Sequence, residues 1–327
     1  MAALFVTSPE RGSGKTTVCA GIGKSLQNAG KKVGYFKPII DNGGKSVGAD
    51  GDAEFMKNIL SLDETVDLIS PVVSSKGNLA GSLKEAFNKV SRGKDVVIIE
   101  GNSGQFQASG DIAGALDART LIVETYSGKP GDKVESYKGP GDLLLGVVIN
   151  RVPEIRIERV RNEARVNVLG VLPEDRVLFA LTIGEIAGHI QGEVLRGGEQ
   201  SAELVENIML GALAVDHGPE YFGRKDNKMV VLRSDRPDMQ MAAMETSTRC
   251  LVITGDTPLK AVVLDRAEEK NMPIILTKDD AGTVVGNIEG ILEGKKLNQP
   301  NKAERLAAVI EKNLDIQALY KGLGIAG

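Results

Sequence analysis

The feature that most constrains this chain is a short apolar run that leads directly into a glycine-rich loop. Residues 4–7 read LFVT, residues 8–17 read SPERGSGKTT, and a helical pattern begins at Lys15. In strand-loop-helix order, such a loop aims backbone N–H groups at an anion, and its glycines allow a phosphate to approach closely. The sequence therefore predicts a phosphate-binding loop, or P-loop, while a glycine-rich turn before an ordinary helix is the alternative.

The loop pattern assigns residues to the parts of a bound nucleoside triphosphate. Lys15 is expected to bridge the β- and γ-phosphates, and the Thr16 hydroxyl is expected to ligate Mg²⁺. The residues expected to contact the nucleotide are Gly12, Ser13, Gly14, Lys15, Thr16 and Thr17. The strict pattern GxxxxGK[ST] requires glycine at position 9, where this chain has Pro9. Because proline lacks an N–H and fixes φ, we expect the entry to the loop to differ from the common form.

The pattern that follows predicts the fold class and the domain organisation. Short β-branched runs alternate with helical patterns, which is typical of a parallel sheet with helices on both faces. We expect a P-loop NTPase-type α/β domain over residues 1–175, a smaller α/β domain over 178–293 and an amphipathic C-terminal helix over 301–320. In the second domain, Thr182 is expected to cap a helix, with Glu185 completing a capping box. Residues 203–215 are predicted to be helical, and the glycine- and proline-rich run 127–142 is predicted to be a loop.

Charged side chains at the ends of the predicted strands are the remaining candidates for chemistry, because open parallel sheets bind ligands beyond their carboxyl edge. Glu100 ends the apolar run VVII and is either a Mg²⁺ ligand or a solvated strand end. Lys37 either reaches the γ-phosphate or is a solvated lysine. Asp50 and Asp52 either cap the helix that follows them or ligate Mg²⁺, and Asp52 is the better metal candidate.

Composition excludes several classes of partner. Forty basic and 44 acidic side chains give a net charge of −4, without the basic stripe that nucleic-acid binding needs. Cys19 and Cys250 are the only cysteines, and His189 and His217 are the only histidines, too few for a disulfide framework or a zinc cage. We expect His189 at a helix end and His217 in a loop. No signal peptide or membrane-spanning run is visible, so we expect a cytoplasmic protein without nucleic-acid or membrane partners.

Five segments of the first half together resemble the dethiobiotin synthetase-like P-loop proteins, particularly the version that precedes the catalytic domain of long phosphate acetyltransferases. These segments are GSGKTT, YFKP, GDAEFM, IIEG and VVINRVPE, and the resemblance covers about residues 1–175. It implies that MgATP activates a carboxylate or carbamate by phosphoryl transfer, with Lys15 and Lys37 contacting the transferred phosphate. It also implies Mg²⁺ ligands at Thr16, Asp52 and Glu100, and an adenine contact from Asn150, which could equally be a turn former.

The first half departs from this family in ways that affect the expected reaction. After its glutamate, dethiobiotin synthetase has a Gly-Ala-Gly-Gly loop, whereas residues 101–104 of this chain read GNSG. No diaminopelargonate pocket is recognisable, so biotin synthesis is not expected. Cys19 falls in the helix after the P-loop and is expected to be a small buried residue, not a glutaminase nucleophile. We also expect that this chain alone is not a complete phosphate acetyltransferase.

The second half, over about residues 178–293, resembles the DRTGG domain. The segment VVLRSDRPDMQ (230–240) retains the Asp-Arg of the name motif at Asp235 and Arg236, and the segments ETSTRC and ITG extend the match. Such domains accompany nucleotide-sensing modules, so the resemblance implies a regulatory or interaction role. Asp235 is expected either to cap the helix that follows or to form a ligand-facing pair with Arg236.

Three hypotheses for function follow from these patterns. The first is a cytoplasmic ATP-binding regulator of central metabolism that has a metabolic enzyme as its partner. The second is a carboxylate-activating ligase or phosphotransferase related to dethiobiotin synthetase. The third is a structural subunit that nucleotide merely stabilises. The resemblance also implies a homodimer, because relatives commonly pair their P-loop domains.

Overall fold

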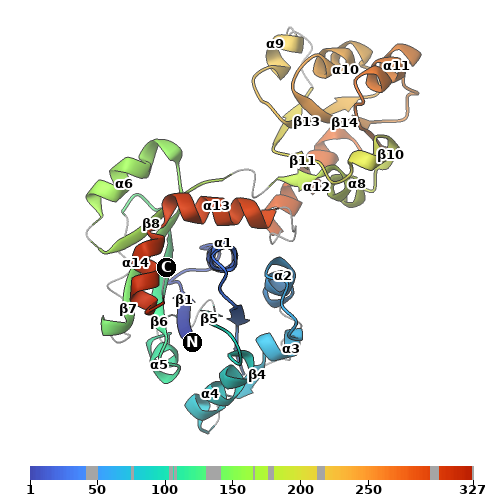
Figure 1. Cartoon of the computed structure of the whole chain (residues 1–327). Coiled ribbons are helices and arrows are strands. Elements are labelled where there is room, and N and C mark those ends of the chain that lie inside the picture. Colours follow the sequence, from blue (N-terminus) through green and yellow to red (C-terminus); the bar gives the residue numbers. More distant parts are fainter. Residues whose placement is uncertain are drawn as a thin grey trace. The chain divides into compact units, whose positions relative to one another are not determined.

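The computed structural model describes residues 1–41, 51–74, 77–102, 106, 109–129, 141–164, 166–175, 180–211, 218–294 and 302–325, without the side chains of 141 and 289–294. The chain divides into two compact units, each with its own sheet (Figure 1). The first unit comprises Met1–Glu174 and Lys296–Gly327, and the second comprises Asp175–Lys295. The chain therefore leaves the first unit, builds the second and returns.

The first unit is built on a six-stranded parallel sheet with the strand order β2-β5-β1-β6-β7-β8. The strands are β2 (Val33–Phe36), β5 (Val96–Glu100), β1 (Ala2–Thr7), β6 (Arg119–Thr125), β7 (Leu144–Val152) and β8 (Val168–Pro173). Their apolar runs are buried because helices cover both faces of such a sheet. The P-loop NTPase-type parallel sheet expected from the sequence is confirmed, and β1 lies in its interior between β5 and β6.

Helices and one short strand pair complete the first unit. The helices are α1 (Lys15–Asn28), α2 (Gly51–Ile59), α3 (Val66–Ile69), α4 (Leu79–Val90), α5 (Ser109–Ala115), α6 (Ile157–Glu163), α13 (Ala303–Asn313) and α14 (Ile316–Leu323). Short 3-10 helices cover Gly141–Leu143 and Glu154–Arg156, and β3 (Ile39–Asp41) pairs with β4 (Val72–Ser74) in parallel. Within the predicted loop 127–142, residues 130–140 lie outside the described part of the chain.

The prediction of a single C-terminal helix over 301–320 is wrong. The first helix, α13, ends at Asn313, and α14 begins at Ile316. Leu314 between them has extended backbone angles, bridges to Gly170 of β8, and is followed by Asp315, whose N–H donates to the Leu169 carbonyl at 2.7 Å. The Asp315 side chain then caps α14. The break occurs because β8 supplies backbone partners that a continuous helix would leave unused.

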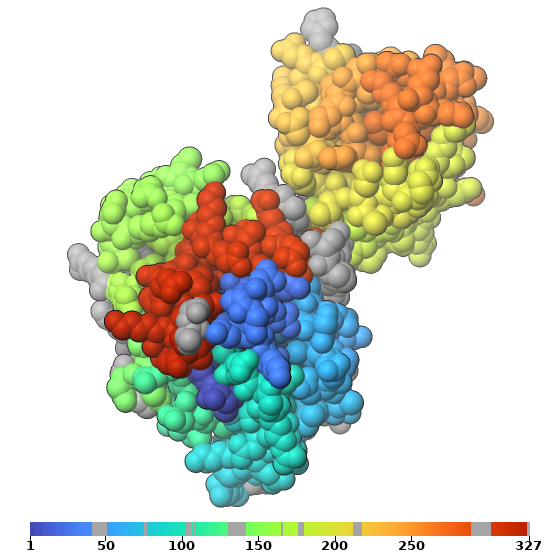
Figure 2. All heavy atoms as spheres, viewed as in Figure 1, coloured from blue at the N-terminus to red at the C-terminus, as the bar shows by residue number. Residues whose placement is uncertain are grey.

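Helix α13 packs on α1, the helix that begins at the P-loop (Figures 1 and 2). A Cβ added to Gly21 of α1 would lie 2.5 Å from a side-chain carbon of Ile310 and 3.0 Å from the Leu306 carbonyl oxygen. At the edge of this contact, Lys24 pairs with Glu304 at 3.2 Å. The last described segment of the chain therefore forms part of the environment of the P-loop helix.

The second unit has a five-stranded sheet with the strand order β10-β15-β14-β13-β12, parallel except for β10. The strands are β10 (Glu193–Arg196), β15 (Ile274–Thr277), β14 (Thr248–Thr254), β13 (Lys228–Arg233) and β12 (Asn207–Leu210). A separate two-stranded sheet pairs β9 (Leu181–Thr182) with β11 (Leu204–Val205) in antiparallel orientation. The helices are α8 (Ile183–His189), α9 (Gly218–Phe222), α10 (Pro237–Met244), α11 (Ala261–Glu269) and α12 (Ala281–Gly294), with a 3-10 helix over Gly198–Gln200.

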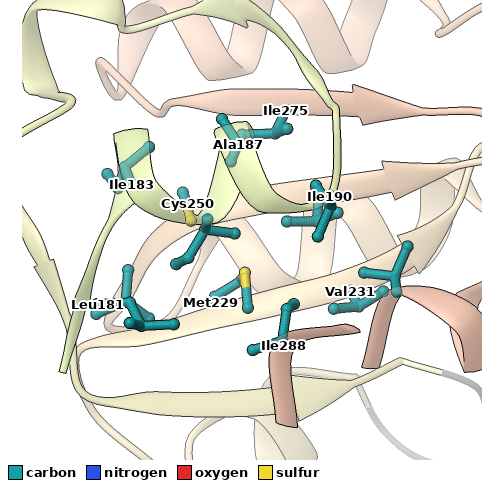
Figure 3. Close-up of a cluster of buried hydrophobic side chains, with 13 residues drawn as sticks. Leu181, Ile183, Ala187, Ile190, Met229, Val231, Cys250, Ile275 and Ile288 are labelled. Atoms are coloured by element: carbon teal, nitrogen blue, oxygen red, sulfur yellow. The ribbon is translucent and has the colours of Figure 1, made fainter. Parts of the chain in front are cut away.

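Two apolar clusters hold this second sheet, one for each face. On one face, Ile183 of α8, Ile190 directly after α8 and Ile288 of α12 pack on strand residues that include Met229 and Ile275 (Figure 3). The other cluster joins α9, α10 and α11 to the strands, and it includes Phe222, Met239, Val263, Val230 and Leu251. The unit therefore has a core of its own, as an independent α/β domain requires.

The start of α8 agrees with the prediction from the sequence. The N–H of Glu185 donates to the Thr182 hydroxyl at 3.2 Å, and the Glu185 carboxylate accepts from the Thr182 N–H at 3.0 Å. The predicted capping box is confirmed. His189 lies in the last turn of the same helix, as expected.

One further prediction for the second unit, and one of the two alternatives given for Asp235, are wrong. Residues 203–211 contain β11 and β12 instead of a helix, because Asn207–Leu210 pairs in parallel with β13 and buries Met209. Residues 212–215 of that range are not described. Asp235 does not cap α10, because Arg236 occupies the N-cap position and the Asp235 carboxylate pairs with Arg233. In the described parts of the chain, no helix has both the length and the apolar character needed to cross a membrane.

Candidate nucleotide site

The P-loop joins the end of β1 to the first turn of α1, which contains Lys15, Thr16 and Thr17. Gly12 and Gly14 have φ values of 70° and 84°, in the left-handed region that strains residues with a Cβ. Space is a second reason for glycine at position 14, because an added Cβ would collide with the Asn150 side-chain amide. The loop therefore requires its two glycines for its conformation, a reason that adds to the close approach of a phosphate expected from the sequence.

The entry to the loop is held by the two residues that flank Pro9. The Ser8 hydroxyl donates to the Glu10 carbonyl at 3.0 Å and accepts from the Glu10 N–H at 3.1 Å. The Glu10 carboxylate accepts from the N–H of Thr125, at the end of β6, at 2.9 Å. These side-chain hydrogen bonds fix the start of the P-loop, where Pro9 replaces the glycine of the usual pattern. The sequence reasoning did not foresee this role for Glu10.

Glu100 is the centre of the site. It ends β5 and is only 2% exposed, so the solvated-strand-end alternative is wrong. One carboxylate oxygen accepts from the Thr16 hydroxyl at 2.8 Å, and the other accepts from the Tyr35 hydroxyl at 2.8 Å. The P-loop helix and the strand β2 are therefore both joined to the end of β5 through this carboxylate.

Lys37, which follows β2, brings a positive charge to the same place. Its side chain is buried, so the solvated-lysine alternative is also wrong. The ammonium pairs with the Asp52 carboxylate in the first turn of α2 and lies 3.5 Å from a Glu100 oxygen. Lys37, Asp52, Thr16 and Glu100 are thus connected by direct contacts, although the sequence separates them by up to 84 residues.

Burial shifts the protonation equilibria of this cluster. Burial lowers the pKa of Lys15, with the Glu100 charge opposing that shift. Burial also raises the pKa of Glu100, against the attraction of Lys37, and it raises the pKa of Tyr35 beside the same carboxylate. Ionisable groups whose pKa values are shifted by burial and by nearby charges are common at functional sites, including those that bind a charged ligand.

Asn150, at the end of β7, braces the P-loop. Its side-chain N–H donates to the Ser13 carbonyl at 2.8 Å, and its side-chain oxygen accepts from the Arg151 N–H at 2.9 Å. Arg151 has a φ of 59° and lies within β7 at a register shift against β8, so Asn150 also stabilises an irregularity of this strand. The contact with Ser13 was not foreseen, and the expected contact between Asn150 and adenine stays a prediction.

Two further residues of the site were missed in the sequence. Tyr35 could have been noticed because a tyrosine within a fully buried strand must find a partner for its hydroxyl. Asn102 is the second missed residue. Its side-chain amide donates to the Pro38 carbonyl at 2.7 Å and joins the segment after β5 to the segment after β2. Of the other predicted candidates, Asp50 and His217 lie outside the described residues.

The chemistry of the donors fits a magnesium ion that arrives with a nucleotide. The Thr16 hydroxyl and the carboxylates of Asp52 and Glu100 are hard oxygen ligands, which Mg²⁺ prefers. Nowhere in the described residues do three or more His, Cys, Asp or Glu side chains form a group that could hold a metal. In proteins, Mg²⁺ is usually held by one or two carboxylates together with phosphates and water, and the carboxylates of Asp52 and Glu100 fit this pattern.

Comparison with known families decides the classification. A family model described as an AAA domain matches residues 2–181, which is more than half of the chain. The chain belongs to this family. Its AAA domain contains the whole P-loop and every residue of the candidate site. Directly afterwards, a model described as the DRTGG domain matches residues 185–291, which confirms the predicted succession of a P-loop domain and a DRTGG domain.

Curated relatives of two kinds match this chain. Phosphate acetyltransferase from Nitrosomonas europaea is 22% identical over 363 residues, which cover 99% of this chain and 52% of that protein. The ATP-dependent dethiobiotin synthetase BioD from Caldicellulosiruptor saccharolyticus is 29% identical over 182 residues, which cover 46% of this chain and 74% of that protein. The chain thus spans about half the length of the phosphate acetyltransferases it matches, and its AAA domain is similar to the ATP-binding synthetase.

Solved structures give distant matches. The CBS and DRTGG domains of the regulatory region of Clostridium perfringens pyrophosphatase, complexed with the activator diadenosine tetraphosphate, match with a TM-score of 0.31. That match has 14% sequence identity and covers 41% of this chain and 67% of the other. Cobyrinic acid a,c-diamide synthase from Mycobacterium smegmatis, with bound ADP and magnesium, matches with a TM-score of 0.34 and 18% identity over 54% of this chain and 88% of the other.

Proposed function

We propose that this chain is a cytoplasmic, MgATP-dependent regulatory protein linked to central metabolism. In this proposal the AAA domain binds MgATP, and the DRTGG domain passes the nucleotide state to a ligand or to a partner enzyme. The whole-chain similarity to phosphate acetyltransferases supports the link to metabolism. The two buried free thiols, Cys19 and Cys250, are compatible with a reducing compartment.

The main support for MgATP binding is that Thr16 and Lys37 both contact the Glu100 carboxylate. A P-loop alone predicts a phosphate site, but here the ends of β2 and β5 add a buried cation and a buried carboxylate beside it. Lys15 and Lys37 would contact the phosphates, while Thr16, Asp52 and Glu100 would hold Mg²⁺. When bound, Mg²⁺ would supply positive charge that offsets the negative charge of the phosphates.

Asn102 supports regulation in preference to transfer of the phosphoryl group to a second substrate. In dethiobiotin synthetase the corresponding loop position is alanine, whereas here an amide side chain reaches the Pro38 carbonyl, one residue beyond Lys37. This hydrogen bond fixes the Asn102 side chain against the segment that follows Lys37, and we infer that a larger, fixed side chain at this loop position disfavours an acceptor site.

A carboxylate-activating ligase or phosphotransferase is the second candidate. It is favoured by the placement of Lys37, a cation suited to stabilise charge on a transferred γ-phosphoryl group. Under that function, ATP turnover depends on an acceptor acid and yields a mixed anhydride. Under the regulatory function, turnover is slow and independent of added acids.

The test has two stages. Calorimetry with ATP and Mg²⁺ should give saturable binding by the wild-type chain and none by Lys15→Ala, while Lys89→Ala, an exposed lysine of α4, should bind as the wild type does. Steady-state ADP release is then measured with and without a series of carboxylic acids. Release that an acid stimulates, with a mixed anhydride as product, would exclude the regulatory function. The absence of MgATP uptake by the folded wild-type chain would exclude both candidates.

The partners belong to the same proposal. A metabolic enzyme is the expected partner, and a homodimer is the assembly that the resemblance to P-loop relatives implies. If regulation operates through a partner, ATP should change the rate of that enzyme without being consumed. Light scattering of the chain with and without MgATP measures whether a dimer forms.

A further inference from the structure

Lys37, which is expected to contact a phosphate, forms an ion pair with Asp52, which is expected to hold Mg²⁺. Lys37 pairs with Asp52 and also lies 3.5 Å from Glu100, so one ammonium group serves both carboxylates. These are the two carboxylates whose oxygens suit Mg²⁺. The protein described here therefore supplies its own cation at the carboxylates on which the metal site depends.

We propose that Lys37 is a built-in substitute for the metal, which must be drawn away by a triphosphate before Mg²⁺ can bind. This inference rests on the proposed function, since it assigns the order of events at the same site. Metal and nucleotide then bind as a coupled pair, because each removes the obstacle to the other. Mg²⁺ alone meets carboxylates whose charge Lys37 already offsets in part, and ATP alone meets a lysine that is already paired.

The surroundings of the cluster favour such an exchange. The exposed fractions of the Lys37, Asp52 and Glu100 side chains are 8%, 17% and 3%, so water does little to screen their charges. At low exposure, an unpaired carboxylate is costly, and some cation must always be near it. Glu100 is also fixed from two sides by Thr16 and Tyr35. Lys37, whose long side chain has several rotatable bonds, is the partner best able to move.

The exchange keeps a cation beside the two carboxylates at every stage. Before binding, Lys37 offsets part of the negative charge of Asp52 and Glu100. After binding, the ammonium faces phosphate oxygens, and a divalent cation takes its place at the two carboxylates. No proton transfer is needed, and the number of buried unpaired charges does not increase.

Removing the lysine should therefore create metal binding that the wild type lacks. Mn²⁺ is a suitable probe because carboxylate sites accept it in place of Mg²⁺ and bound Mn²⁺ is distinguished from free Mn²⁺ by its electron paramagnetic resonance signal. Without nucleotide, Lys37→Met should bind Mn²⁺ at least tenfold more tightly than the wild type. Lys37→Gln tests the same point with a side chain that keeps a hydrogen-bond donor.

Two controls separate this effect from a general change in charge. Lys94→Met removes a lysine from another partly buried ion pair of the same unit, with Glu64 at 2.7 Å, and should leave Mn²⁺ binding as in the wild type. The double variant Lys37→Met with Asp52→Asn should lose the gained binding. If both Lys37 variants fold, by circular dichroism, and neither gains Mn²⁺ binding, the substitute role is wrong. If either folds only when Mn²⁺ is present, the role is supported.

The reciprocal experiment uses ATP in the presence of a chelator. Asp52→Asn weakens one of the two carboxylate contacts of Lys37 and removes a negative charge, so it should bind metal-free ATP several-fold more tightly than the wild type. Equal or weaker binding by this variant would contradict the exchange. Wild-type uptake of MgATP is measured in the same series, so failure of the proposed function is distinguished from failure of the exchange: the first abolishes wild-type binding, and the second leaves it intact.

Discussion

The side-chain amide of Asn150 donates a hydrogen bond to the backbone carbonyl of Ser13 at 2.8 Å, across 137 residues of sequence. The contact is buried, and it joins the end of β7 to the middle of the P-loop. Because a P-loop binds through the directions of its backbone N–H groups, a contact that fixes one of its peptide units also fixes the anion site. The shape of the loop therefore depends on a strand that contributes no residue to it.

Asn150→Ala is expected to weaken nucleotide binding by about tenfold, because leaving a buried carbonyl without its donor costs about 1–3 kcal/mol. Calorimetry with ATP and with tripolyphosphate separates the two roles of this residue. If Asn150 braces the loop, both ligands lose affinity equally. If it reads the adenine edge, only ATP loses affinity. Asn167→Ala removes a similar amide-to-carbonyl bond, to Leu145 at 2.6 Å, and should change neither affinity.

Tyr35→Phe is expected to raise several-fold the Mg²⁺ concentration needed for ATP binding. The substitution removes only the hydroxyl that donates to Glu100 at 2.8 Å, so the carboxylate loses one of the groups that orient it. Binding of ATP without metal should be unchanged, since the P-loop keeps all its contacts. Titrating Mg²⁺ at fixed ATP gives the comparison, with Tyr221→Phe of the second unit as the matched control. An unchanged Mg²⁺ requirement would remove Tyr35 from the site.

The ion pair between Glu64 and Lys94 should make stability depend on pH. Burial alone would raise the pKa of Glu64, but the hydrogen bond and charge of Lys94 outweigh burial and lower it below its ordinary value. A lowered pKa in the folded state gives stability that is fully present above the unfolded pKa, near 4.5, and is lost as the pH falls through the folded value. The pair contributes about 1 kcal/mol at neutral pH.

Urea unfolding at pH 7 and pH 3 checks this contribution. The wild type should lose more stability between the two values than Glu64→Gln, by about the contribution of the pair. Glu85→Gln, at an exposed pair with Lys89 in α4, should behave as the wild type does. Parallel pH curves for wild type and Glu64→Gln would show that the pair has no net effect on folding.

Gly21→Ala should destabilise the first unit by about 1–3 kcal/mol, because the new methyl group enters the close contact between α1 and α13. The opposite result is expected for Gly286→Ala in α12, where no atom lies within 4 Å of the added Cβ. There, alanine should stabilise the helix by about 0.5–1 kcal/mol. Chemical unfolding of each variant measures both effects. A stabilising Gly21→Ala would mean that α13 does not press on α1 in solution.

The sequence predicted the first unit well because its signals are local. Buried parallel strands read as continuous apolar runs, and α1 begins at Lys15 as predicted, because the P-loop marks its start. The errors arose where tertiary contacts overrule local pattern. Residues 207–210 have a helix-compatible composition but pair with β13, and Leu314 interrupts a helical pattern to bridge β8.

The candidate site was predictable only in part, for a related reason. Each of Lys37, Asp52 and Glu100 follows or precedes a recognisable element, so its place at the sheet edge could be inferred. Which of them contact one another could not be inferred, because that depends on side-chain directions set by the whole fold. The contacts of Tyr35 with Glu100 and of Asn150 with Ser13 are of this second kind.

The return of α13 and α14 to the first unit affects how this protein can be dissected. The DRTGG unit, Asp175–Lys295, is one contiguous stretch of the gene, but the P-loop unit is two stretches with the other unit between them. A fragment that stops after residue 175 would leave α1 without the apolar side chains of Leu306 and Ile310. Nucleotide binding should therefore be measured on the full chain, or on one in which the second unit is excised and the two stretches are rejoined.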